Sequence, residues 1–502
     1  MRKIIIFIVL FSSVLFSQSQ FSNFIASLNS APNDSVRTKM IDSFIVYART
    51  RGIPFIEDST VNFIYRGNGS NIYLAGDMNG WSTSSDKFNR VINTNFFYFT
   101  KVYEMDARLD YKFVVDGNWI LDPENPRTVP GGFGPNSELA MPAYIQPQEI
   151  LYNPNIPHGK LFDTTFYSTN LNNSRTIRIY TPPNYATTSD SFPLIVVHDG
   201  LEYVSLASMH NVLDYLIARN EIEPIVAVFI PPVNRNQEYA GNQMVQFTNF
   251  IVNELLPYIE NRYRIKRSPQ YRAVAGASNG GNISLWLALN HPEVFGNVAA
   301  QSSNVITSIQ QGFQNSPKLN LKVYLDIGKY DISVLIPLVR NLKTTLQVKG
   351  YDLLYKEYNE GHSWGNWRAH IDDFLKFFFP KLSSNVNENL DKSNPIHFNL
   401  YQSYPNPFSN ESVRIKFELN DQLKENTISL TKDIFVTIKI FDILGREVKT
   451  ILNQELFPGS YEITLSGNEF VAGIYYYQMQ VYYNDLKTIS KLTQTRKMIC
   501  MK

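Results

Sequence analysis

The sequence predicts an α/β protein in which a mostly parallel sheet is flanked by an N-terminal and a C-terminal β-sandwich. Within residues 156–380, short apolar runs such as PLIVVHD and LKVYLDIG alternate with segments of helical periodicity. This alternation favours a parallel sheet with helices on both faces. Residues 61–144 and 396–502 carry short alternating runs separated by turn residues, a pattern typical of β-sandwiches.

Length, charge and cysteine content limit the classes of function. A chain of 502 residues suggests about three domains. The 46 Lys and Arg residues balance 45 Asp and Glu residues, so the composition carries no sign of nucleic-acid binding. The single cysteine, Cys500, excludes a disulfide within the chain and a cysteine-based zinc site.

Residues 1–19 are predicted to be a signal peptide. The chain starts with the basic MRK, continues with an apolar run, and offers Ser17 and Ser19 for cleavage. A membrane anchor is the alternative, but the apolar run is shorter than the roughly 20 residues that span a bilayer. We therefore expect an exported protein without a stable membrane span.

Residues 20–60 are predicted to be a helical lead-in to the first sandwich. Val36, Met40 and Phe44 share one helical face, and Gly52 marks the end of the helix.

The stretch AVAGASNGG, residues 273–281, allows two interpretations. Asn279-Gly280 is a hairpin signal, whereas Gly276-x-Ser278-x-Gly280 has the spacing of a nucleophile elbow. An apolar strand precedes Ser278 and a helical pattern follows it, with no second alternating strand. The context favours the elbow, with Ser278 as the nucleophile.

A serine nucleophile needs a base, and His362 is the best candidate among seven histidines. It follows the strand-like LLYKEY and comes last in the order nucleophile, acid, base. His198, at the end of the PLIVVH strand, is the main rival. The other five histidines have less suitable positions: His158, His210, His291, His370 and His397.

An acid is needed to orient the base, and Asp331 is the preferred candidate because it lies just beyond a strand end. Asp326 lies within that strand, and Glu360 is too near His362 in sequence for the usual geometry.

The tetrahedral oxyanion needs two amide donors. We expect one from the backbone of Asn279 and the other from Gly200 or Leu201, in the loop after PLIVVHD. Trp364 and Trp367 flank His362 and would either line a substrate pocket or pack against the loop.

Six segments resemble, in order, the putative esterase family, which includes enterochelin, feruloyl and acetyl-xylan esterases and esterase D. The resemblance implies an α/β-hydrolase fold and a serine carboxylesterase whose nucleophile, base and acid fall on Ser278, His362 and Asp331. Some siderophore esterases of this family work with a serine–histidine dyad, which leaves the acid open. The segments are RTIRIYTPPNY, LIVVHDGLEY, FIVNELLPYIENRYRI, AGASNGG, DIGKYD and EGHSWGNWR.

Two details concern the substrate side of this resemblance. Asn279 stands where family members often carry a bulky residue. Arg235 and Glu238, in PPVNRNQEYAG, match the family's substrate-side loop and would either hold a polar group of the substrate or form an ordinary surface ion pair.

Residues 61–141 resemble a family 48 carbohydrate-binding module through GDMNGW and YKFVVDGNWILDPENP. The resemblance places sugar contacts on Trp81, Lys112, Trp119 and Asn136. Esterases of this group also use the domain as a structural cover near the active site, so both roles stay open.

The end of the chain resembles the C-terminal sorting domain of type IX secretion substrates. A polar linker at residues 381–395 precedes it, and YPNPF, IKIFDILGREV and AGIYYYQM carry the likeness. It implies the type IX secretion machinery as a partner and a secreted or cell-surface location.

The combined prediction is an exported serine carboxylesterase that needs no metal or organic cofactor. The motif order favours an enterochelin-esterase-like enzyme, while the sugar-module likeness favours feruloyl or acetyl esters on plant polysaccharide. An inactive hydrolase scaffold that binds glycans is the alternative of another class.

Overall fold

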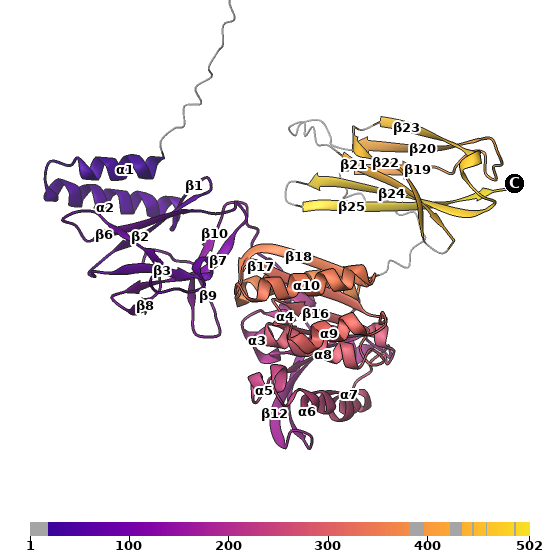
Figure 1. The fold of residues 1–502 in the computed structure, drawn as a ribbon, viewed down its shortest axis with the longest axis horizontal. Helices are drawn as coiled ribbons and strands as arrows, with labels where there is room; N and C mark the ends of the chain where they lie inside the picture. Colours follow the sequence, from indigo (N-terminus) through magenta and orange to yellow (C-terminus); the bar gives the residue numbers. More distant parts are fainter. Residues whose placement is uncertain are drawn as a thin grey trace, which may run out of the picture. The chain divides into compact units, whose positions relative to one another are not determined.

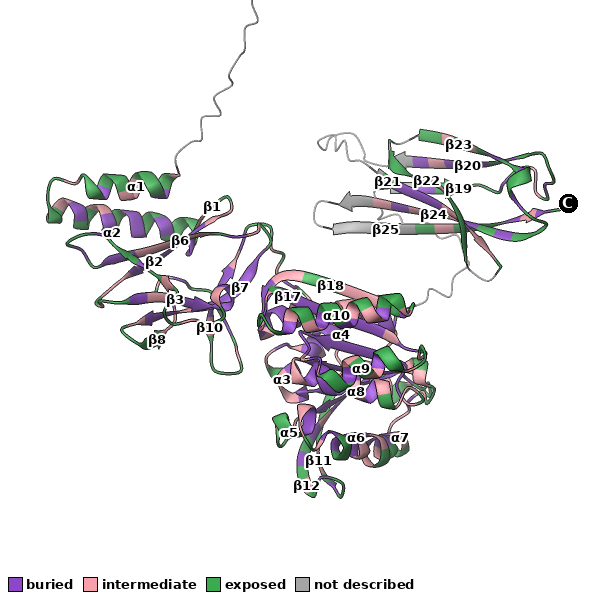
Figure 2. Cartoon of the chain, viewed as in Figure 1, coloured by how far each residue is buried: buried purple, intermediate pink, exposed green. Residues whose placement is uncertain are grey.

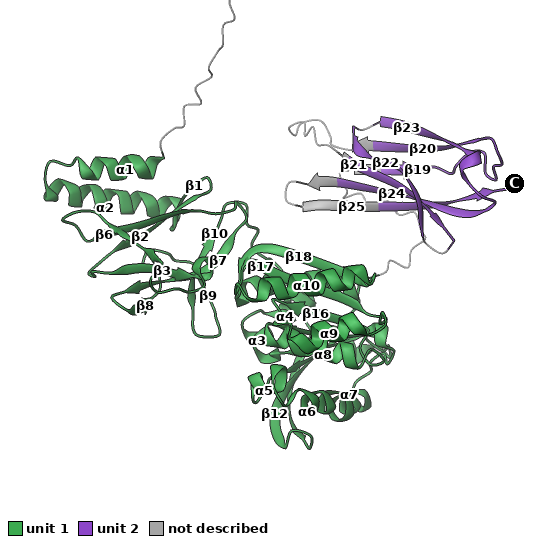
Figure 3. Cartoon of the chain, viewed as in Figure 1, with its two compact units in different colours: residues 1–383 green, residues 384–502 purple. Residues whose placement is uncertain are grey.

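The computed structural model describes residues 19–381, 396–421, 434–443, 446–457, 459–485 and 488–501. The predicted signal peptide, apart from Ser19, and nearly all of the predicted linker lie outside these ranges. The chain forms two compact units, residues 1–383 and 384–502 (Figure 3). In the described ranges, no helix is long and apolar enough to cross a membrane.

The first unit contains the predicted α/β sheet (Figure 1). Its strand order is β11-β12-β14-β13-β15-β16-β17-β18. The pairs from β14 through β18 are parallel, and β11 and β12 are antiparallel, which confirms the predicted fold class. The strands are β11 (Lys160–Ser168), β12 (Asn173–Thr181), β13 (Leu194–His198), β14 (Val226–Ile230), β15 (Arg272–Ala277), β16 (Asn297–Gln301), β17 (Lys322–Tyr330) and β18 (Asp352–Gly361).

Helices cover both faces of this sheet, so its central strands are buried throughout (Figure 2). Val196 and Val274 face a core under α6 to α10, whereas Val197 and Ala275 face a second core under α3, α4 and α12. The helices are α3 (Gly200–Ser205), α4 (Met209–Ala218), α5 (Arg235–Ala240), α6 (Met244–Asn249), α7 (Leu256–Arg262), α8 (Asn279–Asn290), α9 (Thr307–Asn315), α10 (Leu335–Val348), α11 (Trp364–Ala369) and α12 (Ile371–Phe378).

The helical segment QFTNFIVNELLPYIENRY is divided into three parts. A π-helical turn, Phe250–Leu255, separates α6 from α7, and Pro257 lies in the first turn of α7. Proline has no N–H and clashes with the preceding turn, which accounts for the change of register at this position.

The N-terminal module packs two sheets face to face. The first has the order β1-β2-β6-β5, and β3, β4, β8, β9 and β10 gather around β7 in the second. Phe63 points into the core between the sheets, and its neighbour Ile64 points outward against α1 and α2, as strand alternation requires. The elements are α1 (Gln20–Asn29), α2 (Asp34–Arg51), β1 (Phe55–Glu57), β2 (Thr60–Arg66), β3 (Ile72–Gly76), β4 (Asp86–Lys87), β5 (Asn89–Arg90), β6 (Phe96–Val102), β7 (Arg108–Val115), β8 (Asn118–Ile120), β9 (Thr128–Val129) and β10 (Asn136–Ala140).

The module and the α/β domain share one continuous sheet, a feature that the sequence does not predict. Strand β18 pairs in parallel with β7, and Glu360 lies opposite Arg108. The module is therefore built onto the edge of the α/β sheet that carries His362.

The second unit is a separate β-sandwich of two sheets, β19-β20-β23 and β22-β21-β24-β25. Val413 and Ile415 of one sheet share its core with Ile438 and Tyr477 of the other. The strands are β19 (Ile396–Leu400), β20 (Ser412–Asp421), β21 (Ile434–Asp442), β22 (Glu447–Leu456), β23 (Gly459–Ser466), β24 (Gly473–Asp485) and β25 (Thr488–Cys500).

Candidate active site

Ser278 lies at a sharp turn between β15 and α8. Its backbone has φ 56° and ψ −120°, a conformation that non-glycine residues rarely adopt and that clusters at functional sites. A side chain at Gly276 would lie 2.4 Å from the backbone of Gly280, so the close crossing of strand and helix requires glycine there. AVAGASNGG thus forms a strand-to-helix elbow and no hairpin.

The structure brings His362 and Asp331 into direct contact. They follow the neighbouring parallel strands β18 and β17, and His362 Nδ1 lies 2.8 Å from Asp331 Oδ1. The other carboxylate oxygen accepts a hydrogen bond from Ser302 Oγ at 2.6 Å. An Nδ1–H that donates to the carboxylate leaves Nε2 free to take a proton.

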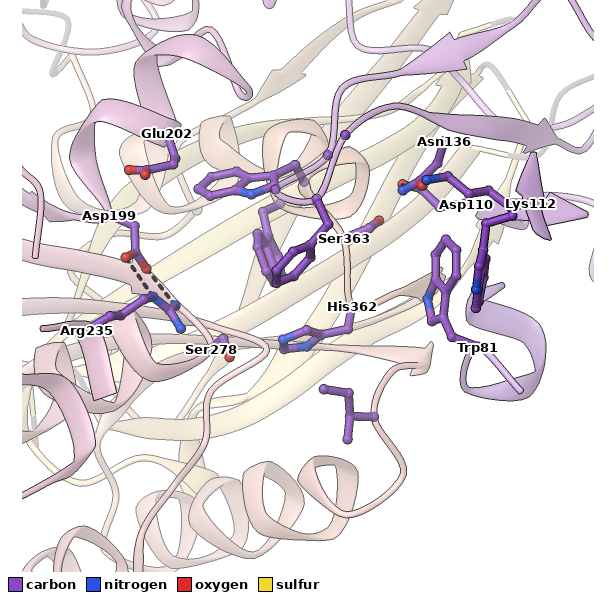
Figure 4. A pocket seen from close by; sticks show the side chains of 18 of the residues that line it. Trp81, Asp110, Lys112, Asn136, Asp199, Glu202, Arg235, Ser278, His362 and Ser363 are labelled. Atoms are coloured by element: carbon purple, nitrogen blue, oxygen red, sulfur yellow. Dashed lines mark hydrogen bonds and ion pairs between the residues drawn. The ribbon is translucent and has the colours of Figure 1, made fainter. Parts of the chain in front are cut away.

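Ser278 and His362 line one cavity of about 680 Å³. Figure 4 shows their side chains close together at one wall of it. The candidate nucleophile and base thus share a cavity, and the candidate acid contacts the base.

The rival residues are engaged elsewhere. His198 is fully buried, with Nδ1 2.9 Å from Ser284 Oγ, and burial lowers its pKa to about 3, which makes it a poor base. Asp326 is buried on β17, where it accepts a hydrogen bond from the Ser302 backbone at 2.9 Å. Burial raises the pKa of Asp326 to about 6. It lies behind the candidate acid and supports Ser302.

We expect the buried His198 to make the protein less stable in acid. Its pKa is lowered from 6.5 to about 3, so between these values only the unfolded state binds the proton, and stability falls as pH falls. At about 1.4 kcal/mol per pH unit, this term removes about 2 kcal/mol between pH 7 and pH 5. Between pH 7 and pH 5, the free energy of unfolding, measured with urea, should fall by about 2 kcal/mol less in His198→Asn than in the wild type. Asp326, whose raised pKa acts in the opposite direction, is present in both proteins and cancels in the comparison. Equal losses in the two proteins would contradict the prediction.

The N-terminal module supplies one side of the cavity. All four residues predicted to contact sugar line it, namely Trp81, Lys112, Trp119 and Asn136. The two tryptophan rings lie 6.2 Å apart at 32°, and Asn136 donates a hydrogen bond to Asp110 at 2.9 Å. The predicted sugar contacts and the candidate nucleophile therefore face the same space.

Arg235 lines the cavity on the α/β side, but not in a pair with Glu238. Its guanidinium makes two hydrogen bonds to Asp199, at 2.8 and 2.7 Å (Figure 4). Glu238 points elsewhere and is buried with Arg175, whose Nη1 lies 2.9 Å away. Of the two residues, only Arg235 borders the space where a substrate would bind.

Both tryptophans near His362 line the cavity. Trp367 is almost fully buried, and its ring meets the imidazole edge-on with centroids 5.0 Å apart. Trp364 in turn meets Trp367 edge-on at 5.0 Å. The two expectations for these residues are thus compatible, because they pack against the His362 loop and also form a wall.

The proposed oxyanion donors occupy the first turns of two helices. Asn279 is the first residue of α8, and Gly200 and Leu201 are the first two of α3, where backbone N–H groups have no intrahelical acceptor. A Cβ atom at Gly200 would lie 2.3 Å from the Ile230 nitrogen. Their neighbours Asp199 and Glu202 line the cavity, whereas these three do not, so the oxyanion assignment stays a prediction.

The sequence did not point to several residues at the site. Ser302 donates a hydrogen bond to Asp331. Nothing in AAQSSNV distinguishes it from the neighbouring Ser303. Its positive φ of 46° marks it in the structure. Asp110 and Phe133 of the module also line the cavity. In the part of the chain that the structure describes, no group of three or more His, Cys, Asp and Glu residues could hold a metal ion.

Three protein-family models match this chain, one in the N-terminal module, one in the α/β domain and one in the C-terminal unit. Residues 168–378 match the family model described as "Putative esterase". The match covers nearly all of the central α/β domain. Residues 59–133 match the glycogen recognition site of AMP-activated protein kinase, and residues 402–494 match the secretion system C-terminal sorting domain.

Curated relatives match mainly the esterase domain. YjcH of Bacillus subtilis, named as uncharacterized, is 26% identical over 234 residues, which are 44% of this chain and 97% of that protein. An iron(III) enterobactin esterase of Escherichia coli is 32% identical over 190 residues, 37% of this chain and 46% of that protein. An endo-1,4-beta-xylanase/feruloyl esterase of Xylanibacter ruminicola is 24% identical over 37% of this chain and 27% of its own length. The chain therefore spans nearly all of the first relative and less than half of the other two.

A solved structure extends the likeness beyond the esterase domain. The enterobactin esterase of Shigella flexneri superposes with a TM-score of 0.55 at 23% identity, over 64% of this chain and 92% of that protein. At this identity the likeness concerns the fold. The superposition covers 64% of this chain, which is more than residues 168–378 alone.

Proposed function

We propose that this protein is a secreted serine carboxylesterase that works through an acyl-enzyme on Ser278. The observation that carries the proposal is the 2.8 Å contact between His362 and Asp331 beside a cavity that also holds the strained Ser278. The esterase-family match of residues 168–378 supports it.

In the proposed mechanism, Ser278 Oγ attacks the ester carbonyl while His362 Nε2 takes its proton. Asp331 orients the imidazole and stabilises its charged form. The N–H of Asn279 and that of Gly200 or Leu201 would hold the oxyanion. His362 then gives the proton to the departing alcohol, and a water molecule, activated by the same histidine, releases the acid.

For the substrate, we propose an enterochelin-type ester first. A relative with 32% identity is named an iron(III) enterobactin esterase, and the fold likeness to an enterobactin esterase covers 64% of this chain. Feruloyl or acetyl esters of plant polysaccharide are the second candidate. The observation that favours them is the pair Trp81 and Trp119 in the cavity, because aromatic faces stack on sugar rings.

A substrate panel tests the proposal and ranks the candidates. Initial rates should be measured with a ferric catecholate ester, methyl ferulate and acetylated xylan, alongside labelling by a fluorophosphonate probe, which reacts with an activated serine. We expect labelling together with the highest kcat/KM on the catecholate ester. A protein that is neither labelled nor active on any ester would match the inactive glycan-binding scaffold.

The tryptophan pair is expected to act on substrate binding. Trp119→Ala should raise KM for the preferred ester about ten-fold, since an aromatic contact of this kind contributes about 1–1.5 kcal/mol, with a smaller effect on kcat. Trp119 suits the test because its side chain is half exposed. The matched control is Tyr167→Ala, which removes an exposed ring on β11. Equal KM values for Trp119→Ala and the control would assign the module a structural role.

The sorting domain supports an extracellular or cell-surface location, since residues 402–494 match a secretion system C-terminal sorting domain. We propose that residues 1–19 direct export from the cytoplasm and that the C-terminal unit engages the type IX machinery.

A further inference from the structure

The loop that carries His362 adjoins the N-terminal module. Strand β18 ends at Gly361 and α11 begins at Trp364, so only His362 and Ser363 lie between them. The register pair of Glu360 with Arg108 joins β18 to β7 of the module two residues before His362.

Arg108 reaches this loop with a fully buried guanidinium. Its Nε donates to Glu138 at 2.8 Å, and its Nη1 lies 2.6 Å from Asp110. The same Nη1 donates to Ser363 Oγ at 3.3 Å. Ser363 Oγ also accepts from the Asn366 backbone, which caps α11. One hydroxyl oxygen therefore connects a cation of the module to the residue that follows His362.

Side chains of the module also fill the space beside two glycines that flank His362. A Cβ atom at Gly361 would lie 2.0 Å from Asp77 Cγ, and one at Gly365 would lie 1.9 Å from Arg108 Nη1. Neither position has room for a larger residue unless the module moves. Asp77 and Arg108 thus pack against the chain on both sides of His362.

We propose that Arg108 is a positioning residue for His362, so that the module is part of the machinery of hydrolysis independently of any sugar that it binds. The inference rests on the proposed esterase function. Glu138 and Asp110 hold the guanidinium at Nε and Nη1. Its face packs against Gly365, and Nη1 also donates to Ser363. A displacement of about 1 Å at a catalytic group lowers the rate about 100-fold. Lysine keeps the charge but lacks the rigid fork of donors.

The test is Arg108→Lys in the full chain. The assay uses a p-nitrophenyl ester that is too small to reach Trp81 and Trp119 of the module. We expect kcat to fall about 10- to 100-fold with KM within about two-fold, and fluorophosphonate labelling of Ser278 to slow by the same factor. The matched control is Arg272→Lys. Arg272 is a buried arginine paired with Glu260 at the start of β15, at the opposite end of the strand from Ser278. It should lower the melting temperature while kcat of the folded protein is retained.

Ser363→Ala keeps the test decisive if Arg108→Lys does not fold, because it leaves the buried charges intact. It removes their link to the loop together with the N-cap hydrogen bond of α11, and thermal unfolding measures the contribution of the cap to stability. Ser363→Ala should also lower kcat and the labelling rate. Folded variants at either position with the kcat and labelling rate of the wild type, or with a change in KM alone, would overturn the positioning role. If the wild-type protein itself is neither labelled nor active on any ester, the proposed function fails, and the positioning role fails with it.

Discussion

Replacing Ser278 with alanine is expected to lower kcat for ester hydrolysis by about 10⁴- to 10⁶-fold, the range seen when the nucleophile of a serine hydrolase is removed. Alanine keeps Cβ and therefore the backbone restrictions of the turn at φ 56°, so the fold should be retained. The loss comes from the missing hydroxyl, because no acyl-enzyme can form without it. Hydrolysis of a p-nitrophenyl ester measures the effect, and fluorophosphonate labelling should disappear in parallel.

A second serine on the same domain provides the control. Ser308 is exposed on α9, and Ser308→Ala should leave both kcat and labelling at the wild-type level. Persistent labelling of Ser278→Ala at the wild-type rate would show that another residue is the nucleophile. Hydrolysis that survives without labelling would point to a reaction that does not pass through a serine.

Replacing Asp331 with asparagine is expected to lower kcat about 10⁴-fold, as in a triad whose acid loses its charge. Asp331 accepts from His362 Nδ1 at 2.8 Å and from Ser302 Oγ at 2.6 Å. An amide at this position can donate to Nδ1, and the imidazole then carries its own proton on Nε2. A protonated Nε2 cannot accept the proton of Ser278. The measurement is kcat against pH for the wild type and the variant, with thermal unfolding to establish that both are folded.

The comparison variant is Asp326→Asn, which changes the buried neighbouring carboxylate behind Ser302. Asp326 accepts hydrogen bonds from Gln301, Ser302 and Tyr324, and it supports His362 only indirectly, through Ser302. The Asp326→Asn variant should therefore lose far less kcat than Asp331→Asn. A loss below about ten-fold for Asp331→Asn would identify a serine–histidine dyad and remove Asp331 from the mechanism.

The parts of the fold and site that the sequence predicted depend on local patterns. Apolar strands that alternate with helical periodicity are read within a window of a few residues, and so is a serine between glycines at a strand-to-helix junction. His362 and Asp331 could be proposed because each follows a strand, and parallel neighbouring strands bring their carboxyl ends together. The contact of 2.8 Å itself depends on the register of β17 and β18, which no local pattern specifies.

The contacts between the module and the esterase domain could not be predicted in this way. In LDYKFVVDG, Leu109, Tyr111 and Phe113 alternate along β7 and lie in the core of the module. Asp110 and Lys112 point to the other face of the strand, and the alternation alone does not say what that face contacts. In the structure that face borders the cavity. The charge of Arg108 is compensated within the module, by Asp110 and Glu138. The Ser363 hydroxyl to which Arg108 donates belongs to the esterase domain, and this contact exists only when both domains have formed.

The junction of β7 with β18 has a consequence for the order of folding. Arg108 and Glu360, which pair across it, are separated by most of the esterase domain, and contacts so distant in sequence form slowly because a long loop must first be closed. The module leaves the ribosome first, yet its shared sheet is complete only after the last strand of the esterase domain is in place. Until β18 is in place, the end of β7 at Arg108 lacks this partner strand. An unpaired strand edge of this kind can pair with other chains, and β18 is the strand that closes it.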